Sequence, residues 1–308
     1  MLTQGHLPSC DGVHSLSYFS FIPEKPSAAV LIIHGMAEYK ERYIYTAEKL
    51  CDEGFAVYCY DQLGHGQSVK EPWEYGYFAK KDGHKALLAD VDAYIAMIRK
   101  NHPGIPVVLL GHSMGSFIVR CAAPGCDIDG LAVSGTGGGN PALGMGIFIC
   151  RIYELLGMGK KRSKFIDSLA MGGNSKGFEN EKYPNRAWLS KEEYIQKDME
   201  EKTFMFTVSG MKDMFTLYSS CSKKSWYDKF PRSLPCYLFS GANDPIGDRG
   251  KGFTAVCDKL RARGCQVQSR LYSGGRHEML NETERDEVIS HLAEFISGVK
   301  IKQGGSDE

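Results

Sequence analysis

Short apolar runs alternate with longer segments of helical period along most of this 308-residue chain. Short runs rich in β-branched and aromatic side chains predict strands, whereas apolar residues three and four positions apart predict amphipathic helices. Their alternation is typical of a mostly parallel sheet with helices in its crossovers. The predicted strands are residues 15–22, 29–34, 56–60, 107–111, 128–134, 235–240 and 267–272. We expect the last five to be buried on both faces.

Helices are predicted between most of these strands, over residues 43–53, 81–100, 114–123, 250–263 and 283–296. Most of them begin or end beside Gly, Pro or Asn, which interrupt helical backbone. The alternation stops between residues 136 and 226, where several amphipathic stretches occur without a clear strand. The pattern therefore predicts an α/β core formed by residues 1–135 and 227–308, with residues 136–226 inserted as a helical cap.

The expected cap is rich in flexible apolar side chains. Seven of the twelve methionines lie in it, alongside several phenylalanines: Met145, Met158, Met171, Met199, Met205, Met211, Met214, Phe148, Phe165, Phe204, Phe206 and Phe215. Methionine adapts its shape to its neighbours, so such a stretch suits an acyl chain, but it also suits the internal core of a cap. The candidate substrate contacts are Phe148, Met211 and Phe215.

Composition narrows the classes of function. Lys plus Arg and Asp plus Glu both number 37, so the net charge is zero and no basic field is present to bind nucleic acid. The one basic run, Lys160, Lys161, Arg162 and Lys164, is either a solvated face or a contact to an anionic substrate or interface. All apolar runs are shorter than the roughly 18 residues of a membrane span. Contact with a lipid surface is therefore expected to be transient at most.

The N-terminus and the cysteines bear on location and cofactors. Residues 1–11 are polar and lack the pattern of a secretory signal. Nine of the ten cysteines are scattered through apparently regular segments, which favours reduced thiols in a cytoplasmic protein over a disulfide framework. The sequence contains neither a Cys-x-x-Cys pair nor a His-Glu-x-x-His motif, so we expect no metal and no other cofactor.

The strongest chemical signal is Gly111-His112-Ser113-Met114-Gly115, directly after one predicted strand and directly before a predicted helix. Gly-x-Ser-x-Gly in this context is typical of a nucleophile elbow, a sharp turn whose glycines leave room where a Cβ would collide. The N-terminus of the following helix favours negative charge at this point. Ser113 is therefore the predicted nucleophile, and the alternative is a plain turn between strand and helix.

A serine hydroxyl needs a base, and the base needs an acid that fixes its tautomer. Two loops after later predicted strands offer these groups: residues 240–245 contain Asp244, and residues 273–278 contain His277. The carboxyl ends of the strands are where open α/β sheets place their sites. We predict His277 as the base and Asp244 as the acid, with Asp248 as the competing acid nearby in the sequence.

Acyl transfer also needs donors for an oxyanion. His34-Gly35-Met36 follows the second predicted strand, so the backbone N–H of Met36 can act together with that of Met114. Both side chains can serve as ordinary packing residues at the same time. Residues 61–68 are glycine-rich but lack the Gly-x-x-x-x-Gly-Lys-Ser/Thr pattern of a phosphate loop, and they are predicted to form a structural turn.

With these residues in place, the chain resembles the monoacylglycerol lipase and lysophospholipase branch of the α/β-hydrolases. The resemblance rests on residues 34–38 with Arg42-Tyr43, residues 61–68, 111–115 and 241–245, and His277, in that order. It implies the α/β-hydrolase fold, a triad of Ser113, Asp244 and His277, and oxyanion donors at Met36 and Met114. It does not extend to residues 136–226, so it leaves the head group and chain length of the substrate open.

We therefore expect a serine hydrolase that cleaves a carboxylic ester of a lipid-like small molecule, a monoacylglycerol or lysophospholipid, through an acyl-enzyme intermediate. One alternative is a carboxylesterase or thioesterase for small or medium acyl groups, which a preference for acetyl esters would favour. The other is a non-catalytic ligand-binding protein that retains the fold. Failure to react with a fluorophosphonate probe would favour that second alternative.

Overall fold

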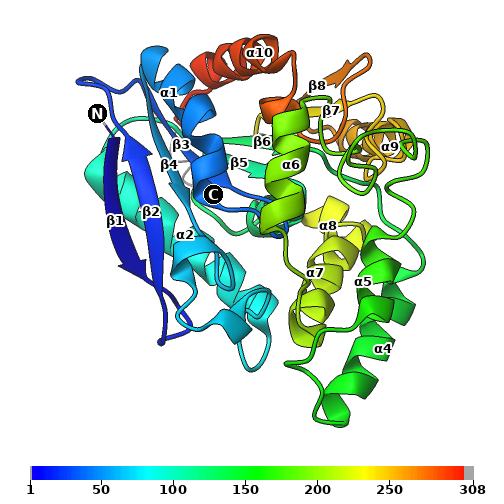
Figure 1. Cartoon of the computed structure of the whole chain (residues 1–308). Coiled ribbons are helices and arrows are strands. Elements are labelled where there is room, and N and C mark those ends of the chain that lie inside the picture. The colour runs from blue at the N-terminus through cyan, green and yellow to red at the C-terminus, as the bar shows by residue number, and fades with distance from the viewer. Residues whose placement is uncertain (1, 302–308) are drawn as a thin grey trace.

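The computed structural model describes residues 2–301 and is built around an eight-stranded sheet (Figure 1). The strand order is β1-β2-β4-β3-β5-β6-β7-β8. β2 pairs antiparallel with β1 and β4, and the other neighbouring pairs are parallel. The strands are β1 (Leu2–Pro8), β2 (Ser15–Phe21), β3 (Ala28–Ile33), β4 (Phe55–Tyr60), β5 (Val107–His112), β6 (Gly130–Ser134), β7 (Cys236–Gly241) and β8 (Val267–Tyr272). The expected, mostly parallel α/β architecture is confirmed; Met1 and residues 302–308 of the predicted core lie outside the described residues.

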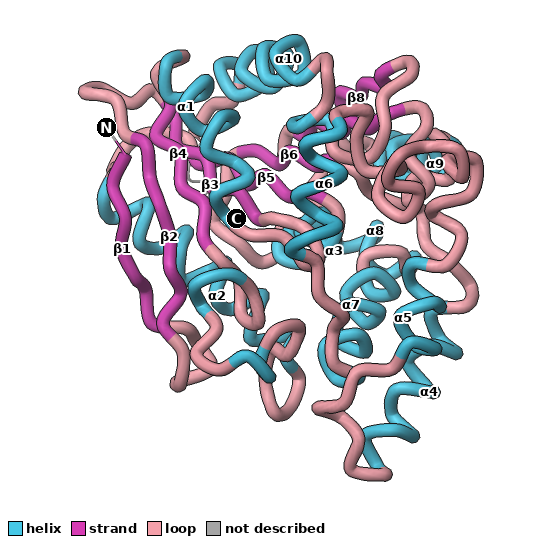
Figure 2. Tube along the Cα trace, viewed as in Figure 1, coloured by secondary structure: helices cyan, strands magenta, loops and turns pink. Residues whose placement is uncertain are grey.

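Helices cover both faces of this sheet (Figure 2). Along β3, Leu31 and Ile33 belong to one hydrophobic core, and Val30 and Ile32 belong to the other, as the alternation of side chains in a strand requires. The core with Val30 includes side chains of α1 (Ile44–Asp52) and α10 (Arg285–Gly298). The opposite core includes side chains of α2 (Gly83–Asn101), α3 (Met114–Ala122) and α9 (Lys251–Arg261). These five helices agree with the predicted ones to within two residues at each end.

The two edges of the sheet differ from the sequence-based expectation. β1 is not predicted by the apolar pattern because most of its side chains are exposed, yet it pairs with β2 from Leu2 to Pro8. β8 was expected to be buried on both faces, and this prediction is wrong. Residues 268–271 are exposed, because β8 is the last strand of the sheet and lacks a neighbour on its outer side.

Between β6 and β7 the described chain forms five helices and no strand. They are α4 (Leu143–Leu155), α5 (Lys164–Met171), α6 (Glu193–Lys202), α7 (Val208–Ser220) and α8 (Lys224–Lys229). We call residues 143–229 the helical segment. α4 packs on α7, where a Cβ added to Gly146 would lie 2.9 Å from the Phe215 ring. None of the described helices is both long and apolar enough to span a bilayer.

Arg120 of α3 fastens the helical segment to the sheet. Its side chain is fully buried, and its guanidinium carbon lies 4.9 Å from the centre of the Trp226 ring. Nη1 donates to Thr136 Oγ1 at 2.9 Å and to the Gly137 carbonyl at 3.0 Å. Nη2 donates to the Cys221 carbonyl at 2.7 Å. One guanidinium thus binds the chain both before α4 and after α7.

Replacing Arg120 with Met should keep most of the buried volume but leave these acceptors without a donor. Hydrogen bonds from a charged donor contribute about 1.5–3 kcal/mol each, so we expect the free energy of unfolding to fall by about 3 kcal/mol or more. Urea denaturation followed by circular dichroism measures the change. Arg151→Met, at an exposed position on α4, is the control and should change stability by less than about 0.5 kcal/mol. Equal losses in the two variants would contradict this role for Arg120.

Candidate active site

Ser113 lies at the turn between β5 and α3, with its backbone in the left-handed region at φ 53°. The turn brings α3 very close to β3. A Cβ on Gly115 would lie 2.1 Å from the Ile33 carbonyl oxygen, and one on Gly111 would lie 2.3 Å from the Gly115 oxygen. The Ser113 N–H donates to the Ser134 carbonyl at 3.0 Å, which ties the turn to β6. Both glycines of the motif are therefore required by close packing.

The predicted base and acid lie side by side in the loops that follow β8 and β7. His277 Nδ1 is 2.9 Å from Asp244 Oδ1, and both side chains are buried. Ser240 Oγ donates to Asp244 Oδ2 at 2.8 Å, and the Ile246 N–H donates to Oδ1 at 2.9 Å. These donors hold the carboxylate in place for the imidazole. Asp248, the competing acid, is exposed.

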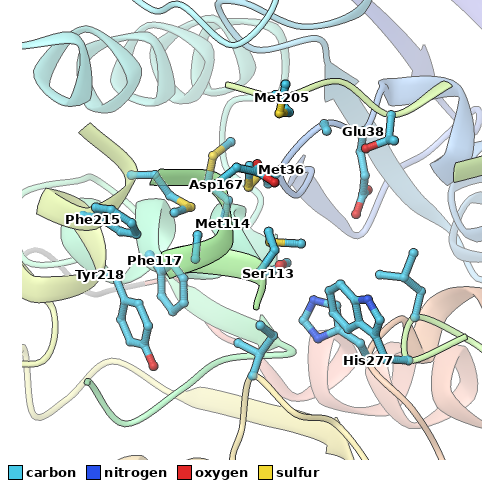
Figure 3. Close-up of a pocket in the computed structure, with 18 of the residues that line it drawn as sticks. Met36, Glu38, Ser113, Met114, Phe117, Asp167, Met205, Phe215, Tyr218 and His277 are labelled. Carbon is cyan, nitrogen blue, oxygen red and sulfur yellow. The ribbon is translucent and has the colours of Figure 1, made fainter. Parts of the chain in front are cut away.

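The second nitrogen of His277 is free to act. Nε2 is buried and has no hydrogen-bond partner among the described residues. Figure 3 shows the imidazole and Ser113 on the wall of the same cavity. Burial alone lowers the pKa of His277, but the carboxylates of Asp244, Glu278 and Glu38 outweigh burial and raise this pKa above its usual value. The surroundings therefore stabilise a positive charge on the imidazole.

The two predicted oxyanion donors come from the ends of neighbouring strands. Met114 is the first residue of α3, where backbone N–H groups lack an intrahelical acceptor. Met36 follows β3, and both residues line the cavity. The next residue, Ala37, has a left-handed backbone with φ 56°. A non-glycine residue in this conformation is held by its surroundings.

His65 supports the loop of residues 34–37 by a hydrogen bond to its backbone. The sequence did not reveal this role. The Ala37 N–H donates to His65 Nε2 at 3.2 Å, while His65 Nδ1 lies 3.0 Å from the Leu63 carbonyl. Burial, chiefly, lowers the pKa of His65 to about 3, so the ring is neutral and Nε2 can accept. Residues 61–68 thus form the predicted structural turn, and the turn also supports the loop that carries Met36.

A cavity of about 410 Å³ opens beside Ser113 and His277 (Figure 3). The helical segment contributes a largely apolar wall that contains Met171, Met199, Met205, Met214, Phe204 and Phe215. Phe215 was an expected substrate contact and does line the cavity. The other two candidates do not: Phe148 is 58% exposed because it lies on the outer face of α4, and Met211 is packed into the hydrophobic core. Four of the seven methionines noted in the sequence line this wall.

Two members of the basic run 160–164 make structural contacts. Arg162 Nε donates to the Met205 carbonyl at 3.0 Å, and Nη2 donates to the Tyr75 carbonyl at 2.8 Å. Lys160 Nζ lies 3.8 Å from the centre of the Trp73 ring. These contacts hold the chain near the cavity wall, although all four basic residues of the run are exposed.

Comparison with known proteins places these features among hydrolases. Residues 24–284 match a family described as serine aminopeptidase, S33. The human monoglyceride lipase is 34% identical over 118 residues, which are 38% of this chain and 37% of that protein. Phospholipase YtpA of Bacillus subtilis is 25% identical over 284 residues, covering 88% of this chain and 96% of that protein.

A crystal structure of a thermostable carboxyl esterase from Bacillus coagulans, in complex with glycerol, has a TM-score of 0.90 and 27% identity over 97% of this chain and 98% of that one. This likeness confirms the predicted α/β-hydrolase fold. The chain matches the mammalian and viral monoglyceride lipases over only 34–37% of their length.

The support that His65 gives to the Met36 loop can be tested with two substitutions. His65→Leu removes the acceptor for the Ala37 N–H, and we expect kcat to fall at least tenfold because loss of one oxyanion donor costs about 10²–10³ in rate. His65→Gln supplies an amide oxygen near the position of Nε2 and should recover part of that loss. Steady-state hydrolysis of a soluble ester measures both variants. Equal losses in Leu and Gln variants would contradict the hydrogen-bond role.

Proposed function

The chain belongs to the serine aminopeptidase S33 family, and we propose that this member hydrolyses a carboxylic ester of a lipid-like substrate such as a monoacylglycerol or lysophospholipid. The observation that carries the proposal is a mostly apolar cavity with Ser113 and His277 on its wall. Its volume, about 410 Å³, lies in the usual range for small-molecule sites. The similarity to a monoglyceride lipase, a phospholipase and a carboxyl esterase adds support. The expected cytoplasmic location is part of the same proposal.

In the proposed mechanism His277 takes the proton of Ser113, and the serine oxygen bonds to the ester carbonyl carbon. The N–H groups of Met36 and Met114 donate to the oxyanion of the tetrahedral intermediate. The carbon–oxygen bond to the alcohol then breaks, and the alcohol leaves with the proton from His277. Water, deprotonated by His277, attacks the acyl-enzyme and releases the acid, while Ser113 recovers its proton. Asp244 keeps Nδ1 protonated and stabilises the imidazolium throughout.

Ser113→Ala tests the nucleophile, and Ser116→Ala, at a buried serine in the first turn of the helix that follows, is the matched control. We expect Ser113→Ala to lose labelling by a fluorophosphonate probe and to lower kcat for ester hydrolysis by at least 10³-fold, because no covalent intermediate can form. The control should be labelled and active. Hydrolysis by Ser113→Ala at the rate of the control would refute the assignment.

Varying the acyl chain length in the same hydrolysis assay distinguishes a lipid ester hydrolase from the alternative functions. Under the proposal kcat/KM rises from acetyl to long-chain glycerol esters, because each added methylene is buried in the apolar cavity. A maximum at acetyl would favour a small-ester carboxylesterase, and a preference for acyl thioesters would favour a thioesterase. Absence of probe labelling in the unmodified protein would favour a non-catalytic binding protein.

We also propose that the outer face of α4 and α5 contacts lipid surfaces. Apolar side chains on these two helices face solvent, among them Phe148, 58% exposed, and Leu155, 87% exposed. Leu169 on α5 is exposed and also lines the cavity, so this face adjoins the cavity. Lys161 lies between the two helices and Lys164 begins α5; both are exposed and favour anionic lipid. An apolar face of this kind is typical of an interaction site.

Replacing Phe148 and Leu155 together with Ser should weaken binding to vesicles of phosphatidylcholine and phosphatidylserine at least tenfold, because two large side chains lose about 1.5–3 kcal/mol each on leaving the lipid. Sedimentation with the vesicles measures binding. Hydrolysis of a soluble butyrate ester should change less than twofold. Val13→Ser, 63% exposed in the turn after β1, is the control and should bind as before. Unchanged vesicle binding in the double variant would exclude this face.

A further inference from the structure

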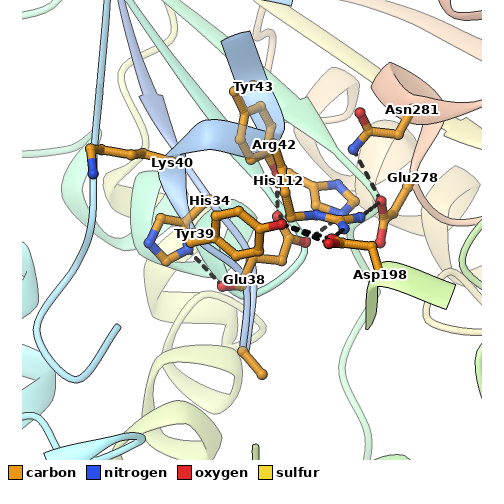
Figure 4. Close-up of polar contacts among 12 residues, drawn as sticks. His34, Glu38, Tyr39, Lys40, Arg42, Tyr43, His112, Asp198, Glu278 and Asn281 are labelled. Carbon is orange, nitrogen blue, oxygen red and sulfur yellow. Dashed lines mark hydrogen bonds and ion pairs between the residues drawn. The ribbon is translucent and has the colours of Figure 1, made fainter. Parts of the chain in front are cut away.

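Three parts of the chain that surround the cavity meet at Arg42 (Figure 4). Arg42 lies in a 3-10 turn, Lys40–Tyr43, which follows the loop that carries Met36. Its side chain is 3% exposed. One side of the guanidinium faces the loop after β8, and the other faces α6 of the helical segment. A single side chain therefore contacts elements that are far apart in the sequence.

On the α6 side, Arg42 Nη1 donates to Asp198 Oδ2 at 2.5 Å. Tyr39 OH donates to Asp198 Oδ1 at 2.8 Å, and Lys202 Nζ donates to the same phenol oxygen at 2.7 Å. The Asp198 side chain is 22% exposed. Met199, the next residue of α6, lines the cavity. The position of this part of the cavity wall thus depends on how α6 is held against the 39–42 turn.

On the opposite side, Arg42 Nη2 donates to Glu278 Oε2. Glu278 directly follows His277, is 1% exposed, and also accepts from Asn281 Nδ2 at 3.0 Å. Its N–H donates to the Leu189 carbonyl at 2.7 Å, in the chain that leads to α6. The backbone next to the proposed base is therefore held by Arg42 and by the helical segment together.

Glu38 completes the cluster and lines the cavity. Its Oε2 accepts from Tyr43 OH at 2.9 Å and lies 4.0 Å from Arg42 Nε, and its Oε1 is 3.5 Å from His112 Nε2. Burial and the Glu278 carboxylate raise the pKa of Glu38 to about 7. Burial would lower the pKa of Arg42, but Glu278, Glu38 and Asp198 raise it, so the guanidinium stays charged.

We propose that Arg42 is a positioning residue that sets the register of helix α6 against the His277–Glu278 loop and the Met36–Glu38 loop, and so joins the shape of the cavity wall to the geometry of the reacting groups. The inference rests on the proposed function, because it takes His277 as the base. Nothing in it requires Arg42 to touch the substrate. Its consequence is that the α6 contact governs the fit of the acyl chain, whereas the Glu278 contact governs turnover.

Asp198→Asn removes the charge that holds α6 to Arg42, Tyr39 and Lys202, while Arg42 keeps Glu278. We expect KM for a long-chain glycerol ester to rise about fivefold or more, while kcat for a soluble butyrate ester changes less than twofold. Glu201→Gln is the matched control: it removes a carboxylate from the same helix, at a position that pairs with Lys197 on the surface. A change that only destabilised the protein would reduce the fraction of active enzyme with both esters and leave KM unchanged.

Arg42→Lys keeps one positive charge but lacks the fork that binds two carboxylates at once. We expect kcat for both esters to fall about tenfold or more, normalised to sites labelled by a fluorophosphonate. In this background Asp198→Asn should raise KM less than in the unmodified protein, because the contact with Arg42 is already lost and only those with Tyr39 and Lys202 remain to be weakened. If Arg42→Lys does not fold, the KM values of Asp198→Asn and Glu201→Gln for the long-chain ester are enough to test the positioning role of Arg42.

The two proposals fail in different ways. Absence of fluorophosphonate labelling at Ser113 in the unmodified protein would overturn the proposed function. Normal labelling, with Asp198→Asn and Glu201→Gln showing the same KM for the long-chain ester, would overturn the positioning role of Arg42 alone.

Discussion

The cavity depends on the close packing of α3 against β3 at Gly115. Because a Cβ there would lie 2.1 Å from the Ile33 oxygen, α3 can approach β3 this closely only with glycine at this position. This approach sets Ser113 beside the loop after β3: a Cβ on Gly35 would lie 3.1 Å from the Ser113 Cβ. β3 and β5 are parallel neighbours, so both loops leave the sheet at the same edge. The proposed nucleophile and the proposed oxyanion donors are thus brought together by strand pairing and by the short distance between α3 and β3.

Much of this arrangement follows from local rules that a sequence reveals. The inner strands are continuous apolar runs because helices cover both their faces, and the loop with Asp244 follows one of them, β7. The loop with His277 follows the edge strand β8. Strand order then brings the two loops together, since β7 and β8 pair directly. The edges did not follow these rules. β1 has no apolar run, and β8, which was expected to be buried, has polar residues at 268–270 and is exposed at 268–271.

The remaining parts of the site depend on contacts that leave no periodic signal. Arg42 and Glu278 are 236 positions apart, and Arg42 and Asp198 are 156 apart, so neither pair belongs to a repeating pattern. The same holds for the helical segment. Phe148 and Phe215 both lie on amphipathic helices, yet one faces solvent and the other the cavity. An apolar stripe shows that a helix buries a face, but it does not show which neighbour covers that face.

A contribution to folding stability does not explain why charged side chains are buried around Arg42. Removing ions from water costs several kcal/mol each, and well-packed apolar residues often serve stability as well or better. Directional ion pairs supply what apolar packing lacks, which is one defined register between three segments. The pairs are also unequal: Asp198 is 22% exposed, whereas Glu278 is 1% exposed. Water can replace the guanidinium at Asp198 far more easily than at Glu278. Any separation of α6 from the sheet therefore breaks the Asp198 contact first and leaves the His277 loop held by Arg42.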